Sequence, residues 1–313
     1  MNISILIPTK DRVYYICRLL FYYDSISFKG NIIILDSSGK ENSIKIKKYY
    51  SKFNLNIEYF HSLGYPGMIM KEYMPKVKSD YIVETGDDDF LIINGLEKCI
   101  NFLNHNLSYS AVHGKSINIL SNNKINEIDG LYHYEQCISL ENKPSVRLYN
   151  HMKNYRVPNF SVFRRKTFED ILKFIPSYNQ AYLCPDRQIV DELIQSCCSV
   201  ICTKVYEINN FYLVRQITPI RNNVRDQINN INKKEYELSL TYLKDVLFKL
   251  LQEYEDSKSF YLQKIIFDSI DNFYKNNKKN NFLKIYFIGF ISKIKNIFIR
   301  NYNLKYIEKN IFY

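Results

Sequence analysis

Three consecutive aspartates, Asp87, Asp88 and Asp89, are the residues whose types and spacing point most directly to chemistry. They follow the apolar run 81–83 and come directly after Gly86. Adjacent carboxylates repel one another, so three of them at a strand end are unfavourable unless a cation offsets their charge. A divalent cation held by carboxylates does this, and it keeps open positions that substrate phosphates fill. The motif predicts a site for a metal-bound nucleotide diphosphate; a solvated acidic turn is the alternative.

The segments before the aspartates predict the framework that positions them. Continuous apolar runs at 3–7 and 31–35 are typical of strands buried on both faces, and residues 56–60 are expected to form a third strand. Stretches with helical spacing separate these strands. This repeated β–α alternation indicates an α/β fold with a doubly wound, mostly parallel sheet. Ligands of such sheets bind beyond the carboxyl ends of the strands. Because Thr9 and Asp36 also fall at strand ends, we expect them beside the aspartates.

Two common phosphate-binding motifs are missing from the chain. No Gly-x-Gly-x-x-Gly follows the first strand, which argues against a dinucleotide-binding domain, and no Gly-x-x-x-x-Gly-Lys-Ser/Thr is present, which argues against a P-loop. A metal on the aspartates would take over the role of such a glycine-rich loop.

Composition restricts the partners and the compartment. The chain has 313 residues and a formal net charge of +11, which suits an anionic partner such as a nucleotide or an anionic lipid surface. No nucleic-acid-reading motif is present. The seven cysteines show no Cys-x-x-Cys spacing, which indicates a reducing cytoplasm. We find no signal-peptide pattern and no apolar run that could span a bilayer.

The C-terminal part differs from the rest. Residues 221–234 are rich in Asn and polar, as expected of a linker, and residues 235–313 have helical periodicity. On a helical projection one apolar face collects Leu283, Phe287, Phe290, Ile294, Ile297 and Phe298, while basic residues gather on and beside the opposite face. This pattern suits an interfacial helix on anionic lipid. A helix packed on the rest of the protein, or on a second copy in a homodimer, is the alternative.

Three motifs in this order resemble those of a known family. The segments 5–12, 35–38 and 86–90 are similar to motifs of the GT-A glycosyltransferases, and most similar to the family-2-like group that transfers sugars into bacterial surface polysaccharides. The resemblance covers about residues 1–220. It implies a Rossmann-like GT-A catalytic domain over 1–220, followed by the linker and the helical C-terminal region.

The resemblance also assigns site residues. The positions that match contacts to the donor nucleotide are Pro8, Thr9, Arg12, Asp36, Lys71, Asp87, Asp88 and Arg215. Asp87 and Asp89 match the Asp-x-Asp motif and would ligate Mg²⁺ or Mn²⁺. His113, at a predicted strand end, and Gln216, beside Arg215, are further expected contacts to donor or acceptor. For Asp36 a turn-capping role is the alternative, and for Arg215 a surface ion pair.

A carboxylate is also expected as the catalytic base. Asp186 falls where the family carries its base, although the family has Glu-Asp there and this chain has Pro185 before Asp186. Asp191 is the second candidate, and for Asp186 an N-cap role is the alternative. One base and one metal imply direct displacement with inversion of the anomeric centre, by analogy with the one-step logic of inverting hydrolases.

These features together lead to one expected function. We expect a metal-dependent, inverting glycosyltransferase of the hexosyltransferase type, which uses a UDP-sugar and a glycan or lipid-linked acceptor. It would act in the cytoplasm, at the inner face of the plasma membrane. The alternative from another class is a non-catalytic module that binds a nucleotide or polyanion. Metal-dependent binding of UDP or GDP separates the two.

Overall fold

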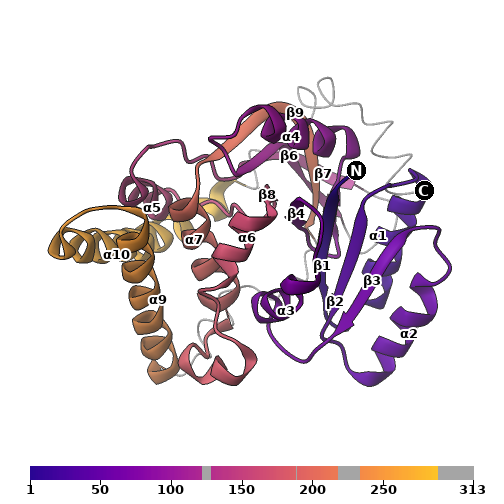
Figure 1. Cartoon of the computed structure of the whole chain (residues 1–313), viewed down its shortest axis with the longest axis horizontal. Coiled ribbons are helices and arrows are strands. Elements are labelled where there is room, and N and C mark those ends of the chain that lie inside the picture. Colours follow the sequence, from indigo (N-terminus) through magenta and orange to yellow (C-terminus); the bar gives the residue numbers. More distant parts are fainter. Residues whose placement is uncertain (122–127, 188, 218–232, 288–313) are drawn as a thin grey trace.

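A nine-stranded sheet forms the centre of the molecule (Figure 1). The computed structural model describes residues 1–121, 128–187, 189–217 and 233–287. The strand order is β3-β2-β1-β4-β8-β6-β9-β5, with β7 paired to β6. The strands are β1 Ile3–Thr9, β2 Asn31–Asp36, β3 Asn56–His61, β4 Tyr81–Glu84, β5 Asp89–Leu91, β6 Ala111–Ser121, β7 Ile128–Tyr134, β8 Val162–Arg164 and β9 Val205–Ile217.

Helices cover both faces of this sheet. The α-helices are α1 Val13–Ser25, α2 Lys40–Tyr50, α3 Pro66–Tyr73, α4 Ile93–His105, α5 Pro144–Lys153, α6 Arg165–Leu172, α7 Gln195–Cys202, α9 Lys233–Tyr254 and α10 Ser259–Phe287. Two 3₁₀ segments, η1 Met74–Lys76 and η2 Tyr178–Leu183, and a π-helix, η3 Ile189–Ile194, complete the described elements. Figure 1 shows α5, α7, α9 and α10 grouped on one side of the molecule and α1 and α2 on the other.

The first strands are parallel, as their apolar runs predict. β1 pairs in parallel with β2 and β4, and β2 pairs in parallel with β3. Along β1, Ile5 and Ile7 enter one core cluster while Leu6 enters the other. Such a strand is covered on both faces, which explains why it is apolar throughout. Antiparallel pairing enters only with β5, β7 and β8, so the expected α/β fold with a mostly parallel sheet is confirmed.

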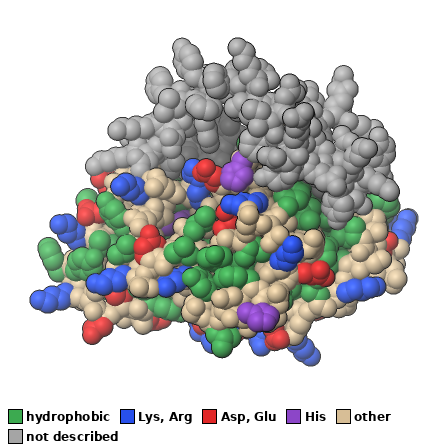
Figure 2. All heavy atoms as spheres, turned by 90° about the horizontal axis from the view of Figure 1, so that it is seen from above, with side chains coloured by type: hydrophobic (Ala, Val, Ile, Leu, Met, Phe, Trp, Pro, Cys, Tyr) green, Lys and Arg blue, Asp and Glu red, His purple; other side chains and the backbone are tan. Residues whose placement is uncertain are grey.

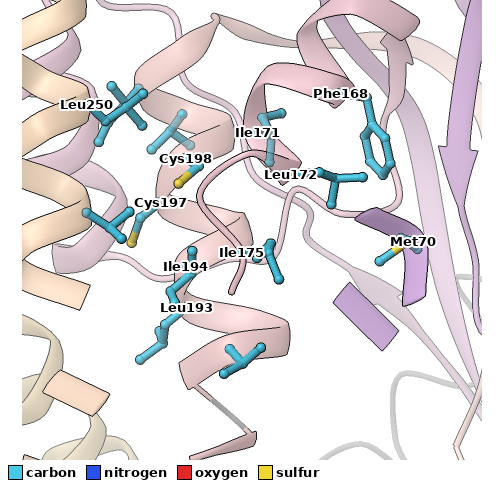
Figure 3. Packing of buried hydrophobic residues seen from close by; sticks show 14 of the residues in the cluster. Met70, Phe168, Ile171, Leu172, Ile175, Leu193, Ile194, Cys197, Cys198 and Leu250 are labelled. Atoms are coloured by element: carbon cyan, nitrogen blue, oxygen red, sulfur yellow. The ribbon is translucent and has the colours of Figure 1, made fainter. Parts of the chain in front are cut away.

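The two core clusters lie on opposite faces of the sheet. One is built largely on α1 and α4, and the other joins α3, α5, α6, α7, α9 and the described part of α10. In Figure 3, Cys197 and Cys198 of α7 lie between Leu250 of α9 and Ile171 of α6. All seven cysteines are free, and burial raises the pKa of the Cys197 and Cys198 thiols, which therefore act as small apolar side chains.

The C-terminal helices are packed onto the sheet domain. Leu247 of α9 and Leu262 of α10 are fully buried in the same cluster as α6 and α7. Most of the predicted linker and the apolar face expected beyond residue 287 lie outside the described residues. Within the part of the chain that the structure describes, no helix is both long enough and apolar enough to cross a membrane.

Two regular elements between residues 128 and 153 were not predicted from the sequence. Strand β7 pairs with β6, and α5 begins with Pro144 in its first turn. The buried face of α5 includes Arg147 and His151 besides Leu148 and Met152. These two polar residues interrupt the apolar periodicity that would have indicated the helix.

Two glycines allow β9 to lie close to its neighbours. A Cβ at Gly95 of α4 would lie 2.2 Å from the carbonyl oxygen of Phe211, and a Cβ at Gly114 of β6 would lie 2.4 Å from that of Asn210. The β6–β9 register shifts at this point. Only glycine fits where another backbone approaches so closely. The glycines thereby fix the position of β9 and of Arg215, near its end.

Arg147 is a buried cation whose hydrogen bonds connect α5 to the end of α7 and to residues 141–142. The residue is 5% exposed, and its guanidinium donates hydrogen bonds to the carbonyls of Val200 (2.5 Å) and Ile201 (2.6 Å), in the last turn of α7. It also donates to the carbonyls of Glu141 (2.8 Å) and Asn142 (2.9 Å). The end of α7 carries carbonyls without helical partners and a partial negative charge, and the arginine satisfies both.

Replacing Arg147 with methionine is expected to lower the free energy of unfolding by about 3 kcal/mol, because the two buried carbonyls of Val200 and Ile201 lose their donor, together with the less buried carbonyls of Glu141 and Asn142. Urea or thermal unfolding measures the change. Arg156→Met is the matched control, since Arg156 pairs with Glu135 at the surface, where side-chain exposures are 48% and 64%, and it should cost no more than about 0.5 kcal/mol. Equal losses in the two variants would contradict this role for Arg147.

Candidate active site

The three aspartates lie where the chain passes from β4 to β5. β4 ends at Glu84, and Asp89 is the first residue of β5. Asp87, Asp88 and Asp89 are only 3%, 2% and 1% exposed. This burial excludes the alternative of a solvated acidic turn. Because charged carboxylates are buried only when they are paired, the next question is what compensates them.

Two arginines pair directly with the aspartate cluster. Arg12 places Nη1 3.1 Å from Oδ1 of Asp87 and Nη2 2.6 Å from Oδ2 of Asp88. Arg215 places Nε 3.5 Å from Oδ2 of Asp89, its direct partner in the β5–β9 ladder. Guanidinium groups therefore already provide the compensation that the sequence argument assigned to a metal ion alone.

A third arginine, Arg18, also acts on the aspartate cluster. It interacts favourably with the charges of Asp87 and Asp88, and its Nη2 donates to Oε1 of Gln216. The sequence analysis missed Arg18. Its signal was a single arginine on a helix whose other inward residues, such as Ile16 and Leu19, are apolar.

Aromatic rings hold all three guanidinium groups in place. The guanidinium carbon of Arg12 lies 4.1 Å from the ring centre of Tyr15, and that of Arg18 lies 5.0 Å from the ring of Phe90. Arg215 lies between Tyr134 and Phe160, at 4.5 and 4.7 Å. Stacking on rings restricts a guanidinium while leaving its edge free for anions.

The ends of β1 and β2 join the cluster, as predicted. Oγ1 of Thr9 donates to Oδ2 of Asp87 at 2.7 Å, and the amide of Ser37 donates to the carbonyl of Thr9 at 2.9 Å. Asp36 is fully buried; its Oδ1 accepts from the amide of Ser38 at 2.8 Å and its Oδ2 from the hydroxyl of Tyr59. Pro8, in β1, pairs with Leu35 of β2. The structure thus brings Pro8, Thr9, Arg12, Asp36 and the aspartates together.

Gly86 leaves space under two of the carboxylates. A Cβ at this position would lie 3.0 Å from Oδ1 of Asp88 and 3.1 Å from Oδ2 of Asp89. Two hard carboxylate oxygens that converge over an open backbone fit Mg²⁺ or Mn²⁺, which takes one or two carboxylates and completes its shell with phosphates and water. No group of three or more His, Cys, Asp or Glu side chains in the described chain is arranged as a metal site, so the fit is to a partial ligand set.

Burial raises the pKa of several carboxyls around the end of β4. The pKa of Asp87 rises to about 7 because it is desolvated, although Arg12 opposes the shift. Desolvation also raises the pKa of Glu84 to about 7 and that of Asp191 to about 6. Perturbed carboxyls that gather at one place are typical of functional sites.

The predicted base candidates lie on and before the π-helix η3. Oδ1 of Asp186 accepts from the amide of Ile189 at 3.1 Å, which is a capping contact. Oδ1 of Asp191 accepts from the amide of Gly67 at 3.2 Å, and its Oδ2 accepts from Nε of the exposed Arg187 at 3.2 Å. Single-turn π-helices occur frequently at functional sites.

The sequence analysis also missed Glu192 and Tyr134. The charge of Glu192 interacts with that of Arg215. Tyr134 interacts electrostatically with Asp89, Arg215 and Glu192. Glu192 thus connects η3 to the aspartate cluster. Its signal was its position next to Asp191.

Two predicted residues are bound elsewhere, and one joins the site. Nζ of Lys71 donates to the carbonyls of Lys173 (2.9 Å) and Ile175 (2.5 Å), beyond α6. His113 is fully buried, with its ring nitrogens at the carbonyls of Gly114 (3.1 Å) and Cys137 (2.8 Å). Burial lowers the pKa of His113, which fits a structural role. Gln216 reaches the site through Arg18.

Comparisons with known proteins identify the fold. No protein-family model and no curated protein matches the sequence. Residues 1–349 of S. aureus TarS, in complex with UDP-GlcNAc, match 88% of this chain and 73% of that chain with a TM-score of 0.56 and 14% identity. Mannosyltransferase PcManGT from Pyrobaculum calidifontis, in complex with GDP-Man and Mn²⁺, matches 87% and 69% with a TM-score of 0.49 and 11% identity. The likeness to TarS, together with the sheet described above, confirms the GT-A fold.

Proposed function

We propose that this protein is a glycosyltransferase that moves a hexosyl group from a UDP-sugar to a hydroxyl of a glycan or lipid-linked saccharide. The observation that carries the proposal is the buried aspartate cluster at the end of β4, joined by Thr9, Arg12 and Arg215 on a GT-A sheet. In open α/β sheets this edge is where ligands bind. The complex of TarS with UDP-GlcNAc supports the choice of a UDP-sugar.

Different residues around the aspartate cluster would hold different parts of the donor. The loop of Asp36 and Ser38 would contact the nucleoside, as the resemblance implies. Arg12 and Arg215 are placed to pair with the diphosphate, because a guanidinium fork matches phosphate oxygens. Asp89, with Asp87 or Asp88, would hold Mg²⁺ or Mn²⁺. When bound, the ion stabilises the negative charge of the leaving diphosphate as a Lewis acid.

Asp191 is our choice for the catalytic base. A base works best when its pKa lies near the working pH, and burial brings the pKa of Asp191 to about 6. Both candidates from the sequence already accept hydrogen bonds, Asp186 from the amide of Ile189 and Asp191 from the amide of Gly67 and from Arg187, so the choice of Asp191 rests on its raised pKa. The proposed base takes the proton of the acceptor hydroxyl as this oxygen attacks the anomeric carbon. A single base opposite the leaving group implies inversion.

A second candidate function, a non-catalytic module that binds a nucleotide, is favoured by one observation. Two arginines already pair with the aspartates, so an anion could bind there without a metal. A polyanion surface has less support: on the face in Figure 2, basic side chains of the described residues lie among acidic ones around a central group of hydrophobic side chains.

Binding of UDP with and without Mn²⁺ separates the two functions. For the transferase we expect Mn²⁺ to tighten UDP binding by on the order of tenfold or more in calorimetric titration, because an ion held by the aspartates would offset the negative charge of the diphosphate. UMP, which lacks the second phosphate, is the matched control and should show little dependence on Mn²⁺. UDP binding that is unchanged by excess EDTA would favour the binding module. Failure of both UDP and GDP to bind would contradict both functions.

Location and assembly are also proposals. We propose a catalytic domain over 1–220, a linker over 221–234 and a helical region over 235–313. The basic tail of that region would bring the enzyme to the inner face of the plasma membrane for polysaccharide biosynthesis, or would pair two copies into a homodimer. Residues 288–313, which carry much of this argument, lie outside the described residues.

A further inference from the structure

Arg12 pairs with two of the three carboxylates from which the metal ligands would come. It bridges two neighbouring side chains, with Nη1 at Oδ1 of Asp87 and Nη2 at Oδ2 of Asp88. The Arg12 side chain is 37% exposed and those of Asp87 and Asp88 only 4% and 3%. The arginine therefore closes the solvent side of a buried acidic pair. Such charge-assisted bonds are among the stronger polar contacts of a protein.

The backbone at Arg12 is fixed, whereas its guanidinium can turn. It lies at the N-cap of α1, directly after Asp11, whose φ of 56° turns the chain. Asp11 is in turn fixed to the β2–α2 loop, because its amide donates to Oγ of Ser38 (2.7 Å) and its Oδ1 accepts from the amide of Gly39 (3.1 Å). The guanidinium of Arg12 also lies over the ring of Tyr15, with its carbon 4.1 Å from the ring centre. A guanidinium on a ring can turn toward a new anion without moving the backbone.

We infer that Arg12 is an internal counter-ion that keeps the aspartate cluster closed to divalent cations until a diphosphate draws the guanidinium away. The inference rests on the proposed function and adds to it an order of events, in which the diphosphate engages Arg12 before a cation binds the aspartates. Arg12 and a cation compete for Asp87 and Asp88, whereas Arg12 and a diphosphate attract one another. A phosphate that engages Arg12 therefore releases the carboxylates. By thermodynamic reciprocity, a cation on the aspartates also frees Arg12 for the phosphate.

This arrangement gives Arg12 two effects of opposite sign. Removing the guanidinium should strengthen binding of Mn²⁺ alone, because its competitor is gone. The same change should weaken binding of UDP, because a phosphate partner is gone. A residue with only a structural role, or one that contacts only the nucleotide, would not give both signs.

The test compares Arg12→Gln with Arg18→Gln. Arg18 is the matched control, since its positive charge also acts on Asp87 and Asp88, but it donates to Gln216 and not to these carboxylates. Binding of Mn²⁺ alone is measured by the electron paramagnetic resonance of the free ion, and UDP binding at saturating Mn²⁺ by calorimetry. For Arg12→Gln we expect Mn²⁺ alone to bind about tenfold tighter and UDP about tenfold weaker. For Arg18→Gln the affinity for Mn²⁺ alone should change less than about threefold.

The coupling between the two ligands provides the second measurement. The factor by which UDP tightens Mn²⁺ binding should be larger in the unmodified protein than in Arg12→Gln. Equal Mn²⁺ affinity in Arg12→Gln and the unmodified protein would overturn the inference, and so would equal gains in Arg12→Gln and Arg18→Gln, which would indicate a general charge effect. If the unmodified protein fails to bind UDP, the proposed function fails; the measurement with Mn²⁺ alone still decides whether Arg12 excludes the cation.

Discussion

Replacing Asp89 with asparagine is expected to reduce sugar transfer about a thousandfold, or roughly 4 kcal/mol of transition-state stabilisation. Asp89 is the proposed metal ligand, and it lies directly across the ladder from Arg215. The amide keeps the shape of the side chain but loses the charge that holds both the cation and the arginine. Release of UDP from UDP-GlcNAc or other UDP-sugars, with the acceptor that gives the highest rate, measures the loss.

The loss of charge at Asp89 also leaves the buried Arg215 without its carboxylate, so stability has to be followed in the same variant. Asp170→Asn is the matched control: Asp170 pairs with Lys166 and Lys173 on the surface of α6. It should keep near-normal activity. Unfolding in urea shows whether Asp89→Asn remains folded at the assay temperature. More than a tenth of normal activity in a folded Asp89→Asn protein would place Asp89 outside the reaction centre.

Replacing Asp191 with asparagine is expected to slow transfer by on the order of a hundredfold or more while leaving UDP binding unchanged. The reaction needs the deprotonated base, so activity in the unmodified protein should rise as the pH increases through about 6, the pKa of Asp191. The pKa of Asp191 is higher in the folded protein than in an unfolded chain. Its contribution to the free energy of unfolding is therefore complete below about pH 4 and is lost as the pH rises to about 6. Asp191→Asn should therefore not destabilise the protein at neutral pH, and its loss of activity is then chemical.

Asp186→Asn is the matched comparison for Asp191→Asn. An asparagine at this position keeps the oxygen that accepts from the amide of Ile189, so transfer should fall less than about fivefold. A large loss in Asp186→Asn, with Asp191→Asn nearly unaffected, would return the base to Asp186. If neither variant loses activity and Glu192→Gln does, the base is Glu192.

The sequence predicted the part of the fold whose strands are continuous apolar runs. β1, β2 and β4 are buried on both faces, and their composition shows this directly. β5 was not predictable, because it has only three residues, begins with a charged one, and pairs with a strand 126 positions later. α5 was missed because two polar residues, Arg147 and His151, lie on its buried face, where carbonyls of the chain satisfy Arg147.

The site was predictable to a similar degree. That Thr9, Asp36 and the aspartates would meet followed from strand ends in a parallel sheet. How their charges are balanced did not follow, since pairing of Asp89 with Arg215 depends on the β5–β9 ladder and the stacking of Arg215 depends on β7 and the segment before β8. Lys71 was assigned from a loose match in position, and only the structure shows that the carbonyls beyond α6 bind it.

For the evolution of this chain, Gly95 and Gly114 are constraints that act at a distance. Neither residue belongs to the aspartate cluster, yet a single methyl group at either one would collide with the backbone of β9 at 2.2 or 2.4 Å. The collision would displace the strand whose end presents Arg215 to Asp89. These two positions can change only if β9 moves, so the site restricts residues that take no part in its chemistry.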